Sequence, residues 1–229
     1  MKVLIACEYS GTVRDAFIAR GHDAMSCDLL PTDKKGPHYQ GSVFDIINDG
    51  WDLMVAHPPC TYLCNSGVCW LYKQQDRFDK MRAGAEFFKQ LLEADIPHIA
   101  VENPIMHKYA KDIVGRGPDQ IIQPWMFGHK EKKGTGLWLK GLPKLKPTTD
   151  LKDETDALPI AVQQRIHWQA PGKDRWKVQP SRESPKLWQS NGESLTKTHS
   201  SSGSFNLLEW LKFNKERTTH EQQILSSEV

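Results

Sequence analysis

Three short polar segments each follow an apolar run, and together they carry residues able to bind and transform a ligand. They are residues 8–11 (Glu-Tyr-Ser-Gly), residues 57–60 (His-Pro-Pro-Cys) and residues 102–104 (Glu-Asn-Pro). The first offers a small-residue turn that admits a ligand to backbone N–H groups, the second a thiol and the third a carboxyl group. In an open α/β sheet the carboxyl ends of parallel strands line one crevice, so we expect the three segments to meet there.

The second and third segments hold the reactive groups. Two prolines restrict the backbone immediately before Cys60, and a cysteine held in such a loop is a candidate nucleophile when its surroundings lower the pKa of the thiol. A buried, inert thiol is the alternative interpretation. Glu102 follows an apolar run, where partial burial favours the protonated carboxyl and hydrogen bonding to a heterocycle nitrogen. Its alternative role is to cap a helix that begins near Pro104.

The cysteines also permit a zinc-binding interpretation. Cys60, Cys64 and Cys69 are separated by three and four residues, and His57 is a further potential ligand. No second Cys or His pair follows downstream, so we expect no metal site and keep a structural zinc module only as an alternative. The five cysteines are an odd number in a chain of 229 residues, which is typical of reduced thiols in a cytoplasmic protein.

The hydrophobic pattern predicts alternating strands and helices around these segments, which indicates an α/β fold with a parallel sheet. The expected helices are residues 12–20 and 77–94, and the expected strands are residues 3–7, 22–27, 52–56, 98–101 and 136–140, the last near a sheet edge.

Composition bounds the class of protein. A hydrophobic fraction of 38% with 8 Trp, 8 Phe and 5 Tyr suffices for one core, which excludes a wholly disordered chain. The sequence shows no signal peptide and no apolar run long enough for a membrane span, so we expect a cytoplasmic protein. The net charge of +2 indicates little about partners. Residues 144–157 are polar without a period, and we expect one compact domain over residues 1–178.

Basic residues gather in one later segment. Lys130, Lys132 and Lys133 are accompanied there by His129 and by nearby aromatic residues. Contact with phosphate groups is one use of such a segment, and a solvated basic surface is the other.

Taken in order, these segments resemble the DNA cytosine-5 methyltransferases, in particular the short members carried by bacteriophages. The resemblance covers residues 1–178 and depends most on Pro58-Pro59-Cys60 and Glu102-Asn103. It implies a Rossmann-like, S-adenosylmethionine-dependent methyltransferase fold, with a mostly parallel sheet and helices on both faces. It also implies that the target cytosine is turned out of the DNA duplex, since carbon 5 is inaccessible inside the stack.

The resemblance assigns roles to individual residues. Cys60 is expected to add to carbon 6 of cytosine, Glu102 to hydrogen-bond or protonate ring nitrogen 3, and Asn103 to support that carboxyl. The expected contacts with S-adenosylmethionine come from the first segment and three later positions, namely Glu8, Tyr9, Ser10, Gly11, Asp28, Ser42 and Pro58. The expected nucleic-acid contacts are His129, Lys132 and Lys133.

Two features depart from the family pattern. Ser42 stands where the family usually has an aspartate for the adenine amino group, so the charge is missing. Only about 30 residues separate Pro143 from Lys173, too few for a target-recognition domain. We therefore expect a monomer whose sequence specificity is loose or supplied by a partner. The alternatives are a catalytically impaired nucleic-acid-binding relative and a modifier of free nucleotides or RNA pyrimidines.

The C-terminal segment is the third departure. Residues 183–194 can be written in codons whose shifted frame encodes Ala-Met-Ala-Lys-Gln-Trp-Gly, a helix end typical of the phage-type relatives. We therefore expect residues 179–229 to be a polar, poorly ordered tail that follows a frameshift near residues 178–183. The nucleotide sequence tests this expectation.

Overall fold

The computed structural model describes residues 1–164. The expected end of the domain at residue 178, the tail at 179–229 and the frameshift therefore lie outside the described residues.

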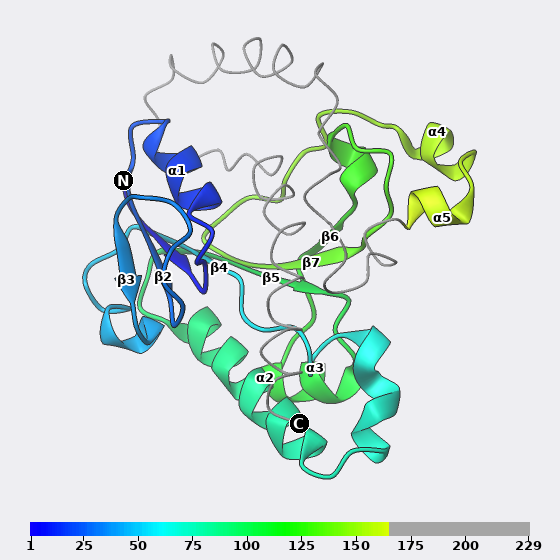
Figure 1. Ribbon diagram of the computed structural model, residues 1–229, viewed down its shortest axis with the longest axis horizontal. Coiled ribbons are helices and arrows are strands. Elements are labelled where there is room, and N and C mark those ends of the chain that lie inside the picture. The colour runs from blue at the N-terminus through cyan, green and yellow to red at the C-terminus, as the bar shows by residue number, and fades with distance from the viewer. Residues whose placement is uncertain (165–229) are drawn as a thin grey trace.

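A mixed sheet organises the described part of the chain (Figure 1). The seven strands run in the order β3-β2-β1-β4-β5-β7-β6. All pairs from β3 to β5 are parallel, whereas β7 runs antiparallel to both β5 and β6. Their bounds are β1 Lys2–Ala6, β2 Asp23–Asp28, β3 His38–Gln40, β4 Leu53–Ala56, β5 His98–Pro104, β6 Gln120–Ile122 and β7 Thr135–Lys140. The strand order reverses between β1 and β4, which is the switch point where ligands bind in doubly wound sheets.

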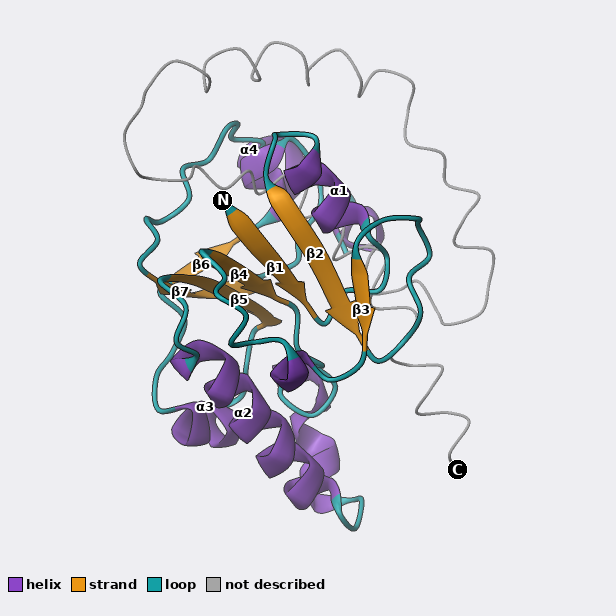
Figure 2. Ribbon diagram, turned by 90° about the vertical axis from the view of Figure 1, so that its left-hand side faces the viewer, coloured by secondary structure: helices purple, strands orange, loops and turns teal. Residues whose placement is uncertain are grey.

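Helices lie on both faces of this sheet (Figure 2). The α-helices are α1 Thr12–Ile18, α2 Arg77–Glu93, α3 Lys108–Val114, α4 Lys152–Asp156 and α5 Ile160–Gln163, and the 3-10 helices are η1 Val43–Asp45, η2 Asn65–Tyr72 and η3 Pro124–Phe127.

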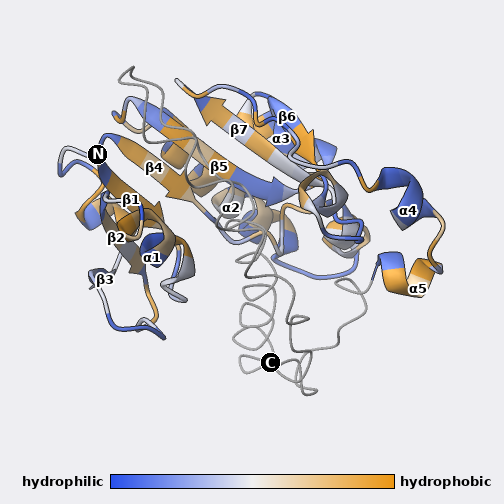
Figure 3. Cartoon of the chain, turned by 90° about the horizontal axis from the view of Figure 1, so that it is seen from above, coloured by the Kyte–Doolittle hydropathy of each residue, from blue (hydrophilic) through white to orange (hydrophobic). Residues whose placement is uncertain are grey.

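Strand residues alternate between two separate cores. Leu4, Met54 and Ile99 pack with Phe88 of α2 on one face, whereas neighbours such as Ile5 pack with α1 on the other. Figure 3 shows hydrophobic colouring along the central strands β1 and β4, which are covered on both sides. This burial explains their continuous apolar runs. The expected Rossmann-like architecture, a mostly parallel sheet with helices on both faces, is confirmed.

The structure corrects the sequence expectation for the third polar segment. Residues 102–104 are not a loop, because β5 continues through Pro104 and pairs with β7 at Glu102, Asn103 and Pro104. The next helix, α3, begins at Lys108 after His107, whose ring nitrogen accepts a hydrogen bond from the Ala110 N–H. Glu102 therefore does not cap that helix.

Several short elements lack a clear signal in the sequence. β6 forms the sheet edge beside β7, and α4 lies within residues 144–157, which were expected to be irregular. Both elements are short, and their pattern is set by contacts with distant segments rather than by local periodicity.

A buried arginine joins the first two loops. The Arg14 side chain is fully buried in α1, and its guanidinium donates hydrogen bonds to the Ser26 hydroxyl (3.2 Å) and the carbonyl groups of Lys34 (3.2 Å) and Lys35 (3.3 Å). It also forms an ion pair with Asp15 at 2.8 Å. These bonds hold residues 32–37 against α1, because a buried guanidinium must satisfy its donors within the protein.

Replacing Arg14 by alanine should destabilise the chain by about 3 kcal/mol, because several buried acceptors lose their partner and a cavity forms. Chemical denaturation measures the loss. Arg20→Ala is the matched control, since that exposed arginine follows α1 and its side chain donates to the nearby Ala16 carbonyl. It should change stability by less than about 0.5 kcal/mol. Equal effects of the two substitutions would contradict the role given to Arg14.

Candidate active site

The first two polar segments and the end of β5 lie at the same edge of the sheet. Ala6 at the end of β1 pairs with Ala56 at the end of β4, and Ala56 pairs with Val101 of β5. The His57 N–H donates to the Ala6 carbonyl at 3.0 Å, which continues this register by one residue. Residues 8, 57 and 102 therefore come just after paired positions of the three adjacent strands β1, β4 and β5, at the same edge of the sheet.

A buried imidazole contacts the candidate catalytic carboxyl. Nδ1 of His57 lies 3.4 Å from Oε1 of Glu102, and the two residues are 0% and 5% exposed. Sequence reasoning considered His57 only as a zinc ligand. The position of His57 directly after a buried strand could have indicated a functional residue. Its contact with Glu102 could not be predicted, because Glu102 belongs to a different strand. An imidazole and a carboxyl at this distance can pass a proton between them inside a water-poor site.

The candidate nucleophile belongs to a pair of thiols. Cys60 is half-buried in a turn in which its carbonyl accepts the N–H groups of Leu63 (2.9 Å) and Cys64 (3.0 Å). The Cys60 thiol forms a hydrogen bond with that of Cys64, and this bond lowers the pKa of Cys64 to about 5. The Ser66 hydroxyl, 3.2 Å from the Cys64 sulfur, and the Gly67 N–H act in the same direction. The thiolate, which is the reactive form of cysteine, therefore lies on Cys64 at neutral pH, and the Cys60 thiol donates a hydrogen bond to it.

The turn that carries Cys60 runs beside the extension of β5. Cys64 forms an antiparallel bridge with Met106. On either side of it, Asn65 N–H donates to the Ile105 carbonyl at 2.7 Å, and His107 N–H donates to the Leu63 carbonyl at 3.0 Å. The thiol pair and Glu102 therefore come from adjacent segments that are joined by backbone hydrogen bonds.

Asn103 lies on the other face of the sheet from Glu102, because successive residues of a strand alternate. It shares the α2 face with Ile99 and Val101. Its side chain is fully buried, and among the described residues neither amide atom has a hydrogen-bond partner. Asn103 was expected to support the neighbouring carboxyl, but its side-chain amide forms no hydrogen bond with Glu102 among the described residues.

Glu8 faces the protein interior rather than the edge of the sheet. Its buried carboxylate accepts hydrogen bonds from the Ser10 hydroxyl (3.0 Å) and from the N–H groups of Val13 (2.8 Å) and Arg14 (3.3 Å) at the start of α1. Burial raises the pKa of Glu8, although these hydrogen bonds oppose the shift. Glu8 therefore shapes the turn through the α1 N-terminus, and its carboxylate does not reach toward a ligand.

Gly11 is required by the same turn. Its φ of 68° lies in the left-handed region, and a Cβ built there would lie 2.4 Å from the Arg14 guanidinium. Ser10 is buried and Tyr9 is half-buried, with the Tyr9 carbonyl accepting the Asp33 N–H at 3.0 Å. The Ser10 hydroxyl also accepts the Thr12 N–H at 3.2 Å, so the turn is held by its own hydrogen bonds.

The remaining candidate cofactor residues lie at neighbouring strand ends. Asp28 ends β2, is half-buried and accepts the Leu30 N–H at 3.0 Å. Ser42 follows β3 and is also half-buried, and its hydroxyl caps η1 by accepting the Phe44 N–H at 3.3 Å. The Gly41 N–H donates to the Asp28 carbonyl at 2.9 Å, so the two positions are adjacent. Pro58 is buried behind the second segment.

Two lysines of the basic segment form ion pairs with acidic residues of α4. Lys130 and Lys132 form ion pairs with Glu154 and Asp156, each at 2.6 Å. Lys133 is buried, whereas His129 is exposed. Both paired lysines stay partly exposed, and their contact with phosphate groups remains a prediction. Since exposed ion pairs contribute about 0–1 kcal/mol, phosphate groups remain able to compete for them.

The zinc alternative finds no support in residues 1–164. Within that range no three His, Cys, Asp or Glu side chains are grouped so that they could hold a metal ion, and Cys69 is exposed on η2. Nor is any helix of the described part long and apolar enough to cross a membrane.

No family model matches the sequence, and no curated protein matches it. The solved structures to which the chain is similar include three methyltransferases. One is described as a DNA modification methyltransferase encoded within an E. coli prophage, with 16% identity over 69% of this chain and 55% of that one and a TM-score of 0.40. Another is the Entamoeba histolytica methyltransferase EhMeth, with 17% identity, coverage of 66% and 57% and a TM-score of 0.43.

The third is the S. pombe methyltransferase Dnmt2, with 12% identity, coverage of 72% and 56% and a TM-score of 0.41. The chain thus spans between 55% and 57% of the length of these structures.

Alkylation of the Cys60–Cys64 pair by iodoacetamide should have a titration midpoint near pH 5, because the lowered pKa of Cys64 keeps a thiolate in the pair down to that value. Tandem mass spectrometry locates the modified sulfur. In Cys64→Ser the reaction with this low midpoint should disappear, because the sulfur with the lowered pKa is gone. A wild-type midpoint of about 8.5, the ordinary value for cysteine, with the fold intact by circular dichroism, would show that the pair holds no thiolate at neutral pH.

Proposed function

We propose that this protein transfers a methyl group from S-adenosylmethionine to carbon 5 of cytosine in DNA. The observation that carries the proposal is the thiolate-bearing Cys60–Cys64 pair beside the extension of β5, the strand that also presents Glu102 to His57. A sulfur nucleophile and a buried acid at one sheet edge are the two groups that addition to a pyrimidine ring requires.

The residues act in a defined order. The Cys60 thiol passes its proton to the neighbouring Cys64 thiolate. Its sulfur then donates an electron pair to carbon 6 and forms the S–C6 bond, while the electrons of the C5–C6 double bond move toward carbon 5 and ring nitrogen 3. Glu102 stabilises the charge on nitrogen 3 by a hydrogen bond or a proton, and His57 replenishes that proton. Carbon 5 takes the methyl group, and its proton leaves to a solvent base as the S–C6 bond breaks. The proton on nitrogen 3 returns through Glu102 to His57, and the Cys60 sulfur takes its proton back from Cys64.

The residues at the switch point fit S-adenosylmethionine in part. Asp28, at the end of β2, offers a half-buried carboxylate to a ribose hydroxyl, and the turn at Tyr9, Ser10 and Gly11 opens α1 beside it. Ser42 offers only a neutral hydroxyl, already engaged with η1, to the adenine amino group. When bound, S-adenosylmethionine supplies an electrophilic methyl group, and this site holds it with one carboxylate fewer than the family pattern.

The proposal includes the finer assignments. The chain is a short, bacteriophage-type cytosine-5 methyltransferase that acts in the cytoplasm of a bacterial host, as a monomer, with DNA as its partner. The exposed His129 contacts the DNA, and Lys132 joins it when phosphate replaces Asp156, whereas the buried Lys133 supports this segment from within. Asn103 supports Glu102 through the backbone of β5, and Pro58 contributes shape to the cofactor site.

A duplex that contains 5-fluorocytosine should trap the enzyme covalently, because the fluorine cannot leave as the C5 proton does. Cys60→Ser should abolish the adduct, as judged by a shifted band and by mass spectrometry of the linked peptide. Cys64→Ser is the matched control: it should keep the adduct but form it about tenfold more slowly at pH 7, because no Cys64 thiolate is left to accept the Cys60 proton.

The alternatives give other results in the same assay. Cofactor binding without any adduct would indicate a nucleic-acid-binding relative that has lost catalysis. An adduct with fluorinated mononucleotide or RNA, but not with DNA, would indicate another pyrimidine substrate. If Cys60→Ser still forms the adduct, Cys60 is not the nucleophile and the proposed mechanism is overturned.

His57→Ala should slow methyl transfer from labelled cofactor by about 100-fold, the usual contribution of one acid–base group, and should flatten the pH dependence of kcat. His98→Ala is the control, because that histidine lies at the other end of β5 and contacts the Gly141 carbonyl. Both variants should bind S-adenosylmethionine with unchanged affinity. A loss of rate without any change in the pH profile would show that His57 serves only packing.

A further inference from the structure

An exposed aromatic surface lies beside the turn that carries the thiol pair. It is formed from η2, the start of α2 and the approach to α3, and the side chains remain 36–69% exposed. Single exposed apolar residues are common on soluble proteins, whereas a group of them marks an interaction site. We call it the aromatic surface; its members are Trp70, Tyr72, Phe78, Ile105 and Tyr109.

Three of its rings form one cluster. The ring centroids of Tyr72 and Phe78 are 5.4 Å apart, and Tyr109 lies 6.3 Å from the first and 6.2 Å from the second. A hydrogen bond joins the Tyr72 and Tyr109 hydroxyl groups. Trp70 carries a cation instead, with the Lys73 Nζ 5.4 Å from its ring centroid. The rings are therefore held in place before any ligand arrives, which reduces the entropy lost on binding.

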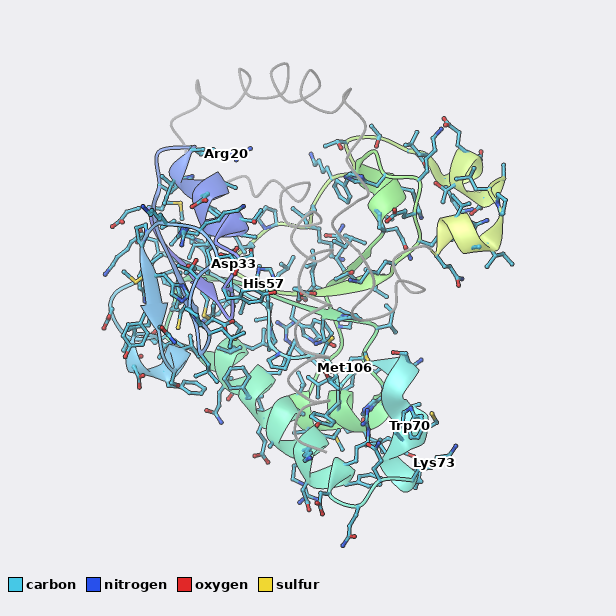
Figure 4. The ribbon with its side chains drawn as sticks, in the orientation of Figure 1. Arg20, Asp33, His57, Trp70, Lys73 and Met106 are labelled. Atoms are coloured by element: carbon cyan, nitrogen blue, oxygen red, sulfur yellow. The ribbon has the colours of Figure 1, made fainter. Side chains whose placement is uncertain are left out.

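The surface connects directly to the candidate active site. Cys64 is the N-cap of η2, the helix that holds Trp70 and Tyr72. Met106, the bridge partner of Cys64, follows Ile105 of the aromatic surface. Figure 4 shows Met106 between His57 and Trp70 in that view. A ligand that reaches the thiol pair would thus extend over these rings.

The charge around the rings favours a polyanion. Residues 65–82 and 105–112, which contain all five members, hold six lysines and arginines but only three aspartates. A second copy of the chain would bring this positive charge against itself, whereas a phosphodiester backbone would neutralise it. Aromatic rings interleaved with cations are the recurring design for unpaired nucleic acid, because every base presents a face for stacking.

We infer that the aromatic surface stacks unpaired bases of the DNA strand that flanks the target cytosine. This inference rests on the proposed function and names its substrate class, an opened or single DNA strand. Bases within a duplex hide their faces, so exposed rings gain contact only where pairing is lost. Stacking is tolerant of sequence, which suits a chain without room for a target-recognition domain.

The test measures fluorescence anisotropy of a dye-labelled single-stranded oligodeoxynucleotide of about 12 nucleotides. Trp70→Ala should weaken binding roughly five- to one-hundredfold, the range for loss of one stacked base. Trp70→Phe, which keeps a ring, should lose much less. Ile121→Ala is the control: it removes a similarly exposed apolar side chain on β6, outside the aromatic surface, and should bind like the wild type.

Salt dependence separates stacking from charge. Lys73→Gln should reduce the slope of log K against log salt by about 0.7, the value for one phosphate contact on a single strand. Trp70→Ala should weaken binding at every salt concentration and leave that slope unchanged. A slope change in Trp70→Ala equal to that in Lys73→Gln would assign the loss to charge and overturn the stacking role.

Other outcomes also decide the question. Unchanged affinity in Trp70→Ala, equal dependence on Trp70 for a fully paired duplex, or tighter binding of RNA than of DNA would each overturn the inference. Self-association that Trp70→Ala abolishes, with no effect on the oligonucleotide, would assign the surface to a second copy. The fluorocytosine adduct is measured separately: its absence with stacking intact would refute methyl transfer alone, and its presence without stacking would refute the aromatic surface alone.

Discussion

The hydrogen-bonded register of β1, β4 and β5 is the constraint on which the candidate site depends. Ala56 pairs with both Ala6 and Val101, so the residues that follow these three positions lie at the same edge of the sheet. A slip of one residue in β5 would move Glu102 to the α2 face and away from His57, because side chains alternate along a strand. The apolar residues of both faces prevent that slip, since it would expose two cores at once.

Buried polar groups build the turn beside this register. Glu8 and Arg14 are both fully buried, and each is surrounded by hydrogen-bond partners from the start of α1 or from residues 26–37. Such groups cost free energy to bury and recover it only through those partners. Gly11 and Gly36 complete the arrangement, because a Cβ at either position would collide with the Arg14 guanidinium. The shape of the proposed cofactor edge therefore depends on residues that do not contact the cofactor.

The proposed chemistry and the proposed binding surface meet at one short segment. Residues 60–65 carry the thiol pair at one end and enter η2 at the other, and their backbone bonds to residues 105–107 fix both. Arg77 adds a further restraint, since its guanidinium donates to the Thr61 carbonyl at 3.2 Å and lies over the Tyr62 ring. A rigid connection of this kind keeps a nucleophile in place while a flexible strand is bound.

The sequence by itself determined the alternation of strands and helices, the two-sided burial of the central strands and the position of Cys60 directly after a strand end. These properties depend on local periodicity and on proline, which act within a few residues. Only the tertiary structure decided that β5 extends through Glu102, that His57 contacts that carboxyl, and that Cys64 shares the thiol chemistry. It likewise turned Glu8 inward and engaged Lys132 with Asp156. Each of these outcomes joins segments far apart in the chain or depends on close packing, and no local pattern encodes such a contact.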